Sequence, residues 1–189
     1  DNSAGSAISV LDACLVTGFR ALTLDSITVT SNVATATYSS GHGYTTRKMV
    51  DIAGASSGGL NGRKLITVTG ASTFTYPAPG VADGTYSGTA KRSPLGWAKP
   101  VHTGNVAIFT RTDVAATAMA LRVDDSTAGA TTIRVRMVEG YTDINTFTGP
   151  APTDAQLSGG GHWAKGANTS TPKRWVLVGD SRMFYLFTD

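Results

Sequence analysis

Apolar and polar residues alternate along most of the chain, and this period of two is typical of half-buried β-strands. In "ITVTSNVATATY" (residues 27–38) Ser31-Asn32 interrupts the alternation, which predicts two strands joined by a tight turn because Asn tolerates positive φ. Further strands are predicted in "RKMVDIAG", "RKLITVTG", "STFTYPAPG" and "TYSGTAKR". Six short strands within residues 22–93 predict a small antiparallel barrel or sandwich.

A segment near the start has helical spacing instead. Ile8, Leu11 and Leu15 recur at i, i+3 and i+7 in "SAISVLDACLVTGF" (residues 6–19), which predicts a helix with one apolar face. Such a face needs a cover, either the β-domain behind it or a neighbouring subunit. We expect this helix, within an N-terminal segment of residues 1–21, to serve docking or oligomerisation.

A second region of alternation follows "KRSPLGWAKP", in which Pro94 and Pro100 bracket Trp97. Because proline interrupts strand pairing, we place a boundary there, between residues 22–93 and residues 94–189. Strands are predicted in "AMALRVDD" and "TIRVRMVEG", and "RWVLVGDSRMFYLF" predicts a hairpin at the centre of the second core. The expected fold is mainly β, with an N-terminal helix followed by two small antiparallel β-barrel or β-sandwich modules.

The charge of the chain is mildly basic, with 16 Lys and Arg against 13 Asp and Glu. The basic residues come partly as doublets near predicted strand ends, scattered along the chain. A nucleic-acid binder concentrates such charge on one face or helix, so we do not expect nucleic acid as a partner. We expect all the doublets to be solvated strand ends or to contact an acidic protein partner, and the first two supply the candidate interface residues. These candidate interface residues are Arg47, Lys48, Arg63 and Lys64.

The single cysteine, Cys14, excludes an internal disulfide and lies in the apolar helical pattern, where we expect a small core residue. No apolar run approaches the roughly 18 residues of a membrane span. The first residues also lack the basic leader of a secretory signal, so we expect a protein made and assembled in a cytoplasm, without a membrane partner.

One tripeptide suggests an enzyme. Gly179-Asp180-Ser181 resembles the nucleophile turn of Gly-Asp-Ser esterases, which carry a catalytic Asp and His downstream of the Ser. Here only eight residues follow Ser181, and none is His. The tripeptide instead predicts the turn of a hairpin, and we expect no catalytic residue.

Metal sites are not expected either. His42, His102 and His162 lie beside Gly or in loops, and no pair has the i, i+4 spacing of helical ligands. Asp124-Asp125 begins "DDSTAGA", which lacks the regular oxygen spacing and the later acidic ligand of a calcium loop. A turn capped by these carboxylates is the stronger interpretation. We expect no metal and no cofactor.

Aromatic residues leave a carbohydrate-binding interpretation open. Trp97 and Trp163 lie in "GWAK" and "HWAK", where each ring could pack in the protein or contact a ligand or partner. Trp175 and Tyr185 lie in apolar strands and are expected in the core.

Five pieces follow one another in residues 33–89: "VATATYSSGHGY", "MVDIAGA", "GLNGRKLITVTG", "STFTYPAPGVADGT" and "YSGT". Their order and spacing resemble a β-module of virion proteins from tailed bacteriophages. The flanking "LDACLVTGF", "GWAKP", "LRVDD", "EGYTDINTFTGPAP", "HWAKG" and "WVLVGDSRMFYLF" resemble phage and prophage structural proteins of about this size. The resemblance thus covers nearly the whole chain.

This resemblance implies a structural component of the virion, assembled in the bacterial host cytoplasm from copies of itself and other virion proteins. It brings no catalytic residues. We favour a tail, baseplate, tail-tip or fibre-attachment protein. A capsid decoration (cement) protein and a host-glycan binding module that uses Trp97 or Trp163 are the alternatives. Position in the particle, copy number and host stay open.

Overall fold

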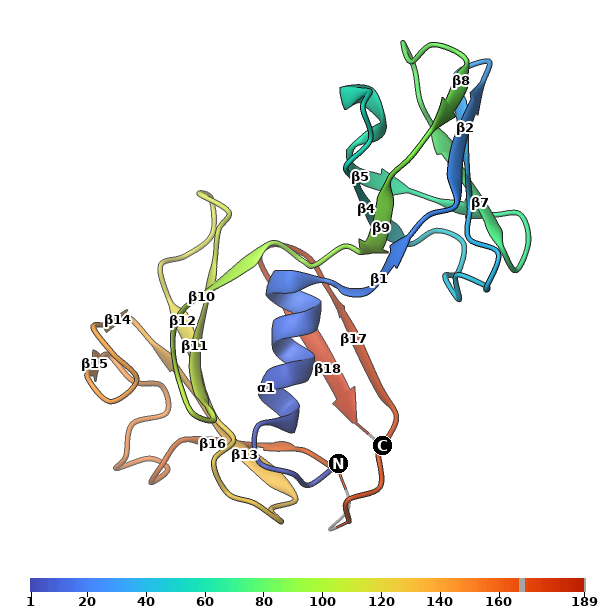
Figure 1. The fold of residues 1–189 in the computed structure, drawn as a ribbon. Helices are drawn as coiled ribbons and strands as arrows, with labels where there is room; N and C mark the ends of the chain where they lie inside the picture. The colour runs from blue at the N-terminus through green and yellow to red at the C-terminus, as the bar shows by residue number, and fades with distance from the viewer. Residues whose placement is uncertain (167–168, 189) are drawn as a thin grey trace. The chain divides into compact units, whose positions relative to one another are not determined.

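The computed structural model describes residues 1–166 and 169–188 (Figure 1). Strands hold 44% of the chain and helices 8%, so the protein is mainly β, as predicted. It has one N-terminal helix and several small antiparallel sheets, none of which closes into a barrel.

The chain divides into two compact units. The inserted unit comprises Gly18–Ser93, and the terminal unit comprises Asp1–Thr17 with Pro94–Asp189. The segment 1–21, expected to form a docking element, is therefore divided. Residues 1–17 belong to the terminal unit, and residues 18–21 begin the inserted unit.

The inserted unit contains two antiparallel sheets. The first has the order β1 (Phe19–Thr23), β9 (Thr89–Arg92), β4 (Met49–Ala53), β5 (Gly62–Leu65). The second has the order β6 (Thr67–Val68), β7 (Thr73–Pro77), β3 (Val33–Thr37), β2 (Ser26–Thr30), β8 (Gly84–Tyr86), and a short 3₁₀ helix η2 (Gly58–Leu60) precedes β5. One core takes side chains from both sheets, among them Ile27, Ile52 and Phe74, so the unit is sandwich-like.

The predicted turn at Ser31-Asn32 joins β2 and β3. Both residues have positive φ, 50° and 64°, and Thr30 pairs with Val33 across the two-residue loop. Positive φ at both central positions matches the right-handed twist of the flanking strands, which is why such loops favour Asn.

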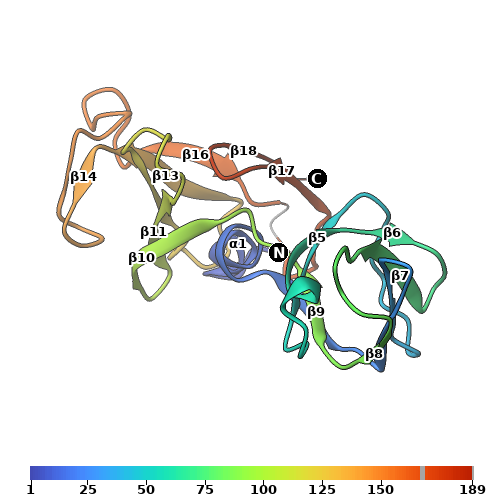
Figure 2. The same ribbon diagram turned by 90° about the horizontal axis from the view of Figure 1, so that it is seen from above.

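The terminal unit is built on a five-stranded antiparallel sheet. Its order is β10 (Trp97–Thr103), β11 (Val106–Arg111), β12 (Ala120–Asp124), β13 (Thr132–Val138), β16 (Gly161–Ala164). The terminal unit also contains two separate hairpins. One pairs β14 (Gly140–Tyr141) with β15 (Phe147–Thr148), and the other pairs β17 (Trp175–Gly179) with β18 (Phe184–Thr188). Helix α1 (Ser6–Leu11), extended by the π-helix η1 (Asp12–Thr17), lies between the large sheet and the β17–β18 hairpin (Figures 1 and 2).

The apolar face of the helix is covered by its own unit. Leu11 and Leu15 are fully buried and Ile8 is nearly so, in one core with strand residues such as Phe109 and Leu121. Burying a leucine side chain contributes about 1.5–3 kcal/mol. These three residues therefore hold the fold together, and the expectation that they dock a neighbouring subunit is corrected.

A buried ion pair holds the start of the helix. Lys165 Nζ lies 2.5 Å from Asp125 Oδ1, and these two side chains are 2% and 1% exposed. The other carboxylate oxygen of Asp125 accepts the Ala7 N–H at 2.9 Å, and Lys165 also donates to the Ser3 carbonyl. The N-terminal turn is thus attached to two separate segments of the terminal unit.

No helix among the described residues is both long and apolar enough to cross a membrane.

Candidate functional site

The C-terminal hairpin is the most unusual surface of the protein. In the β17–β18 register, Val176 lies opposite Phe187 and Val178 lies opposite Tyr185. Because successive side chains of a strand point to opposite faces, these four residues share one face. We call this set the hairpin face.

The other face of the hairpin is covered. Leu177, Phe184 and Leu186 pack against the core that contains the helix and the five-stranded sheet. The prediction that this segment is a central pair of the core is therefore wrong. The hairpin is a separate two-stranded sheet that contributes one face to the core.

The hairpin face itself lies in solvent. Its members Val176, Val178, Tyr185 and Phe187 are 56%, 58%, 57% and 60% exposed. The two rings stack with centroids 6.5 Å apart and together leave on the order of 200 Å² in water, since each ring spans about 200 Å². Met183 at the turn adds a further exposed apolar side chain. Contiguous apolar surface of this kind makes the hairpin face a candidate interaction site.

The turn between the two strands of the hairpin is held by several hydrogen bonds. Asp180 Oδ1 accepts the N–H groups of Arg182 and Met183, and these bonds hold the pKa of Asp180 below its usual range. Arg182 Nε and Ser181 Oγ both donate to Asp113 Oδ2, at 2.8 and 3.2 Å. The hydrogen bond from Arg182 is the largest cause that lowers the pKa of Asp113. Gly179-Asp180-Ser181 forms the hairpin turn that the sequence predicts, with the Ser181 hydroxyl bound to a carboxylate.

Trp97 is a core residue. It is 7% exposed, its Nε1 donates to the Asp180 carbonyl at 3.0 Å, and its ring meets Phe184 edge-on at 5.4 Å. Trp163, half-buried, meets Phe184 from another side at 5.9 Å. The two tryptophans therefore enclose the inner face of the hairpin, and the ring of Trp97 is not available for stacking on a glycan.

Two aromatic residues expected in the core lie at the surface instead. Trp175 is 40% exposed and Tyr185 is 57% exposed. Both strands are apolar at successive positions, a pattern that indicates burial of both faces. The same pattern occurs when one of the two faces is exposed, so the sequence does not show which case applies.

Three of the four predicted basic interface residues come together in the inserted unit. Arg47, Arg63 and Lys64 line one shallow depression, and Lys48 is exposed. Arg63 Nε lies 3.7 Å from Asp51 Oδ1, and Lys64 Nζ donates to the Gly59 carbonyl at 2.7 Å. Arg47 and Lys48 precede β4 and Arg63 and Lys64 lie within β5, and their contact with a partner stays a prediction.

The His-Gly pair of the phage-like pattern has a structural role. His42 is 1% exposed; its Nδ1 accepts the Tyr44 N–H at 2.9 Å, and its Nε2 faces the Gly70 and Thr73 carbonyls at 3.0 and 3.2 Å. Gly43 has φ 61°, and a Cβ there would overlap the Arg20 guanidinium. Both residues determine the local backbone path.

The other pieces of the pattern are packing elements as well. Asn61 Oδ1 accepts the Ala55 N–H at 3.0 Å and its Nδ2 donates to the Ala55 carbonyl at 2.8 Å, which closes the loop before β5. Leu60, Phe74 and Tyr76 are at most 2% exposed. Several residues that carry the resemblance thus lie in the interior of the inserted unit.

No group of three or more His, Cys, Asp or Glu side chains in the described part of the chain could hold a metal ion. Asp124 Oδ1 accepts the backbone and hydroxyl of Ser126, so it caps a turn. Asp125 is the partner of Lys165, a pair that sequence reasoning missed. The two residues are 40 positions apart and no local pattern relates them.

Comparison of this chain with protein-family models, with curated proteins and with solved structures finds no match in any of the three.

Proposed function

We propose that this protein is a structural component of a tailed-phage virion and that it assembles through the hairpin face. The observation that carries the proposal is the exposure of Val176, Val178, Tyr185 and Phe187, each more than half in solvent, on one face of the hairpin. An apolar face of this size favours a protein whose function is to contact other proteins.

The phage-like sequence pattern supports the same conclusion. Residues of this pattern, such as His42, Asn61 and Phe74, serve the packing and local hydrogen bonding of the inserted unit. A particle protein must keep its shape outside the cell, and this chain has one cysteine, Cys14, which is free and buried. Two β-units with separate hydrophobic cores meet that requirement without a disulfide.

The partner that fits the hairpin face is a second copy of the chain. The face carries no charge, so two copies can approach without electrostatic repulsion. Strands β17 and β18 hydrogen-bond only to each other among the described strands, so each has an outer edge with unpaired N–H and C=O groups. A two-fold axis in front of the hairpin would pack the hairpin face of one copy against that of the other and remove both from solvent.

We favour the tail end of the particle, as a baseplate, tail-tip or fibre-attachment protein. A head decoration protein is the second candidate, because the same self-associating surface would serve at either position in the particle. Mass spectrometry of separated heads and tails from purified particles distinguishes the two.

The role of the hairpin face is tested by Val178→Lys. We expect wild-type protein to self-associate in sedimentation velocity, and Val178→Lys to sediment as a monomer, because a lysine on each copy would bring two charges together in an apolar contact. Val114→Lys is the matched control, since Val114 is an exposed valine that lies outside the hairpin.

Particle incorporation gives the second measurement. In a phage that encodes the protein, Val178→Lys should reduce the amount in purified particles by tenfold or more, and Val114→Lys should leave it unchanged. A monomeric wild-type chain at about 100 μM, well above usual affinities for specific pairs, would contradict self-association. Absence of the wild-type chain from particles would contradict the virion role itself.

A further inference from the structure

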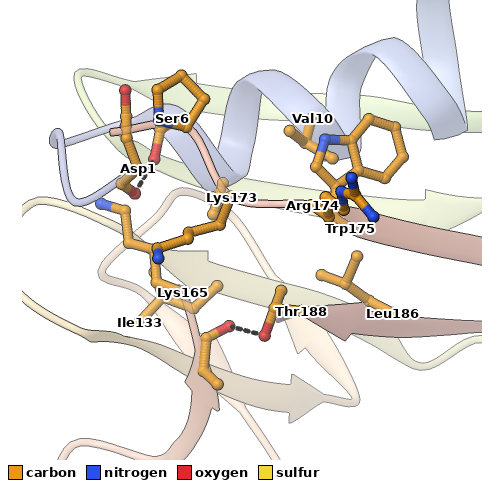
Figure 3. Close-up of a pocket in the computed structure, with 13 residues that line it drawn as sticks. Asp1, Ser6, Val10, Ile133, Lys165, Lys173, Arg174, Trp175, Leu186 and Thr188 are labelled. Carbon is orange, nitrogen blue, oxygen red and sulfur yellow. Dashed lines mark hydrogen bonds between the residues drawn. The ribbon is translucent and has the colours of Figure 1, made fainter. Parts of the chain in front are cut away.

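A cavity of about 220 Å³ opens between the start of the helix, β16 and the inner side of the hairpin (Figure 3). Its walls are mainly apolar. Val10 and Trp175 lie on one side, and Ile133 and Leu186 lie on the other. This cavity is separate from the hairpin face, which points away from the core.

Two cations line the cavity without a carboxylate partner among the described residues. Lys173 and Arg174 line it, and no ion pair in the described part of the chain includes either. The other lysine of the lining, Lys165, is already neutralised by Asp125. Asp1 is the acidic member of the lining, and its Oδ1 accepts the Ser3 N–H at 3.1 Å. The balance at the cavity is therefore positive.

We propose that this cavity binds a small organic anion with an apolar body, an aryl or short-chain alkyl carboxylate. The volume equals about seven waters at roughly 30 Å³ each, which limits the body to about the size of a benzene ring. The ring would lie against Val10, Ile133 and Leu186, where its burial is favourable. The carboxylate would accept a charge-assisted hydrogen bond from Lys173 or Arg174.

The hydroxyl groups of the cavity wall already donate to backbone carbonyls, so they compete little with the two cations for a bound ligand. Ser6 Oγ donates to the Asp1 carbonyl at 3.1 Å, and Thr188 Oγ1 donates to the Ala164 carbonyl at 3.4 Å, both drawn in Figure 3. A neutral ligand of the same shape would gain the apolar contacts alone. The site therefore discriminates by charge, with the anion preferred over the amide and over the amine.

The test is a titration of ¹⁵N-labelled protein with benzoate, benzamide and benzylamine, followed by NMR at constant ionic strength. We expect benzoate to shift the Trp175 indole and the Val10 amide saturably, and benzamide and benzylamine to bind at least tenfold more weakly. Lys173→Met should weaken benzoate binding about tenfold or more, the loss typical of one charge-assisted hydrogen bond. Lys48→Met, at an exposed lysine of the inserted unit, should leave it unchanged.

A second variant fills the space. Ala7→Leu adds three carbons to a lining position on the helix and should abolish the benzoate shifts while the thermal midpoint stays within a few degrees. Equal affinity for benzoate and benzamide, shifts confined to other residues, or no saturation up to about 50 mM would each overturn the proposal. Val178→Lys should bind benzoate as the wild type does, so the assembly and ligand hypotheses fail independently.

Discussion

His42, Tyr44 and Phe74 form one aromatic cluster in the inserted unit, with ring centroids 5.3–5.6 Å apart. Two of the three residues also form hydrogen bonds. The His42 nitrogens bind backbone groups, and the Tyr44 hydroxyl donates to the Arg20 carbonyl at 2.9 Å. Tyr76 differs, because its hydroxyl is buried and has no hydrogen-bond partner in the described structure.

The two tyrosines provide a matched pair of substitutions. Tyr44→Phe should reduce the free energy of unfolding by about 1 kcal/mol or more, because the Arg20 carbonyl loses its donor. Tyr76→Phe should leave the free energy unchanged or raise it by up to about 1 kcal/mol, because it removes an unpaired buried hydroxyl. Urea unfolding followed by circular dichroism measures both; an equal loss in both variants would show that Tyr76 has a partner.

At the scale of elements, the helix is held at both ends by other parts of the terminal unit. Asp125 accepts the Ala7 N–H at the first turn. At the other end, the N–H groups of Leu95 and Gly96 donate to the carbonyls of Cys14 and Leu15 at 2.9 and 3.0 Å. Helix termini leave backbone groups unsatisfied, so these contacts explain why a helix of few turns is stable here.

The buried pair Asp125–Lys165 should dominate the stability of this arrangement. Asp125→Asn leaves the Lys165 charge buried without its counter-ion, and we expect a loss of about 3–5 kcal/mol. Arg63→Gln, at a largely exposed pair with Asp51, should cost less than about 1 kcal/mol. Chemical denaturation checks both.

The double variant Asp125→Leu with Lys165→Met separates charge from shape. Replacing a buried pair by apolar residues removes both charges, so this variant should recover part of the loss of Asp125→Asn. No recovery would indicate that the hydrogen bonds to Ala7 and Ser3, rather than the ion pair, stabilise the helix start.

The β17–β18 hairpin shows how one element serves two surfaces. Its inner residues Phe184 and Leu186 pack against the core, and Leu186 also lines the cavity, whereas its outer residues Tyr185 and Phe187 lie in solvent. Since neighbouring positions alternate between faces, a substitution at Val178 changes the hairpin face and one at Leu186 changes the core.

At the scale of the whole molecule, each unit has its own hydrophobic core. Both cores contain ionisable groups that burial keeps protonated. Burial raises the pKa of the Cys14 thiol in the terminal unit to about 11, and those of the Tyr44 and Tyr76 hydroxyls in the inserted unit to about 12. The free energy of unfolding of each unit therefore depends on pH in the alkaline range.

We expect stability to be full below pH 9 and to fall as pH rises towards 12. The unfolded chain loses these protons near pH 9.0 for the thiol and 10.0 for the hydroxyls, whereas the folded chain keeps them to about 11 and 12. The unfolded state thus binds fewer protons in this window, and stability decreases with pH. Thermal melts between pH 8 and 11.5 measure the slope, which Tyr76→Phe should reduce; an unchanged melting temperature across this range would contradict it.

Local features were largely predictable. The helix face at Ile8, Leu11 and Leu15 and the turn at Ser31-Asn32 depend on the spacing and backbone preference of neighbouring residues, which are written directly in the chain. The mainly β class followed from the alternation of period two in the same way.

Exposure was not predictable. Trp97, for which the sequence left core packing and ligand contact both open, is buried, and Tyr185, expected in the core, is exposed. The periodicity of the chain determined which residues share a face and where strands turn, because these properties arise between neighbours. Only the tertiary structure decided which face is covered, that Asp125 meets Lys165, and that a cavity lies beneath the hairpin, because each depends on segments brought together from distant positions.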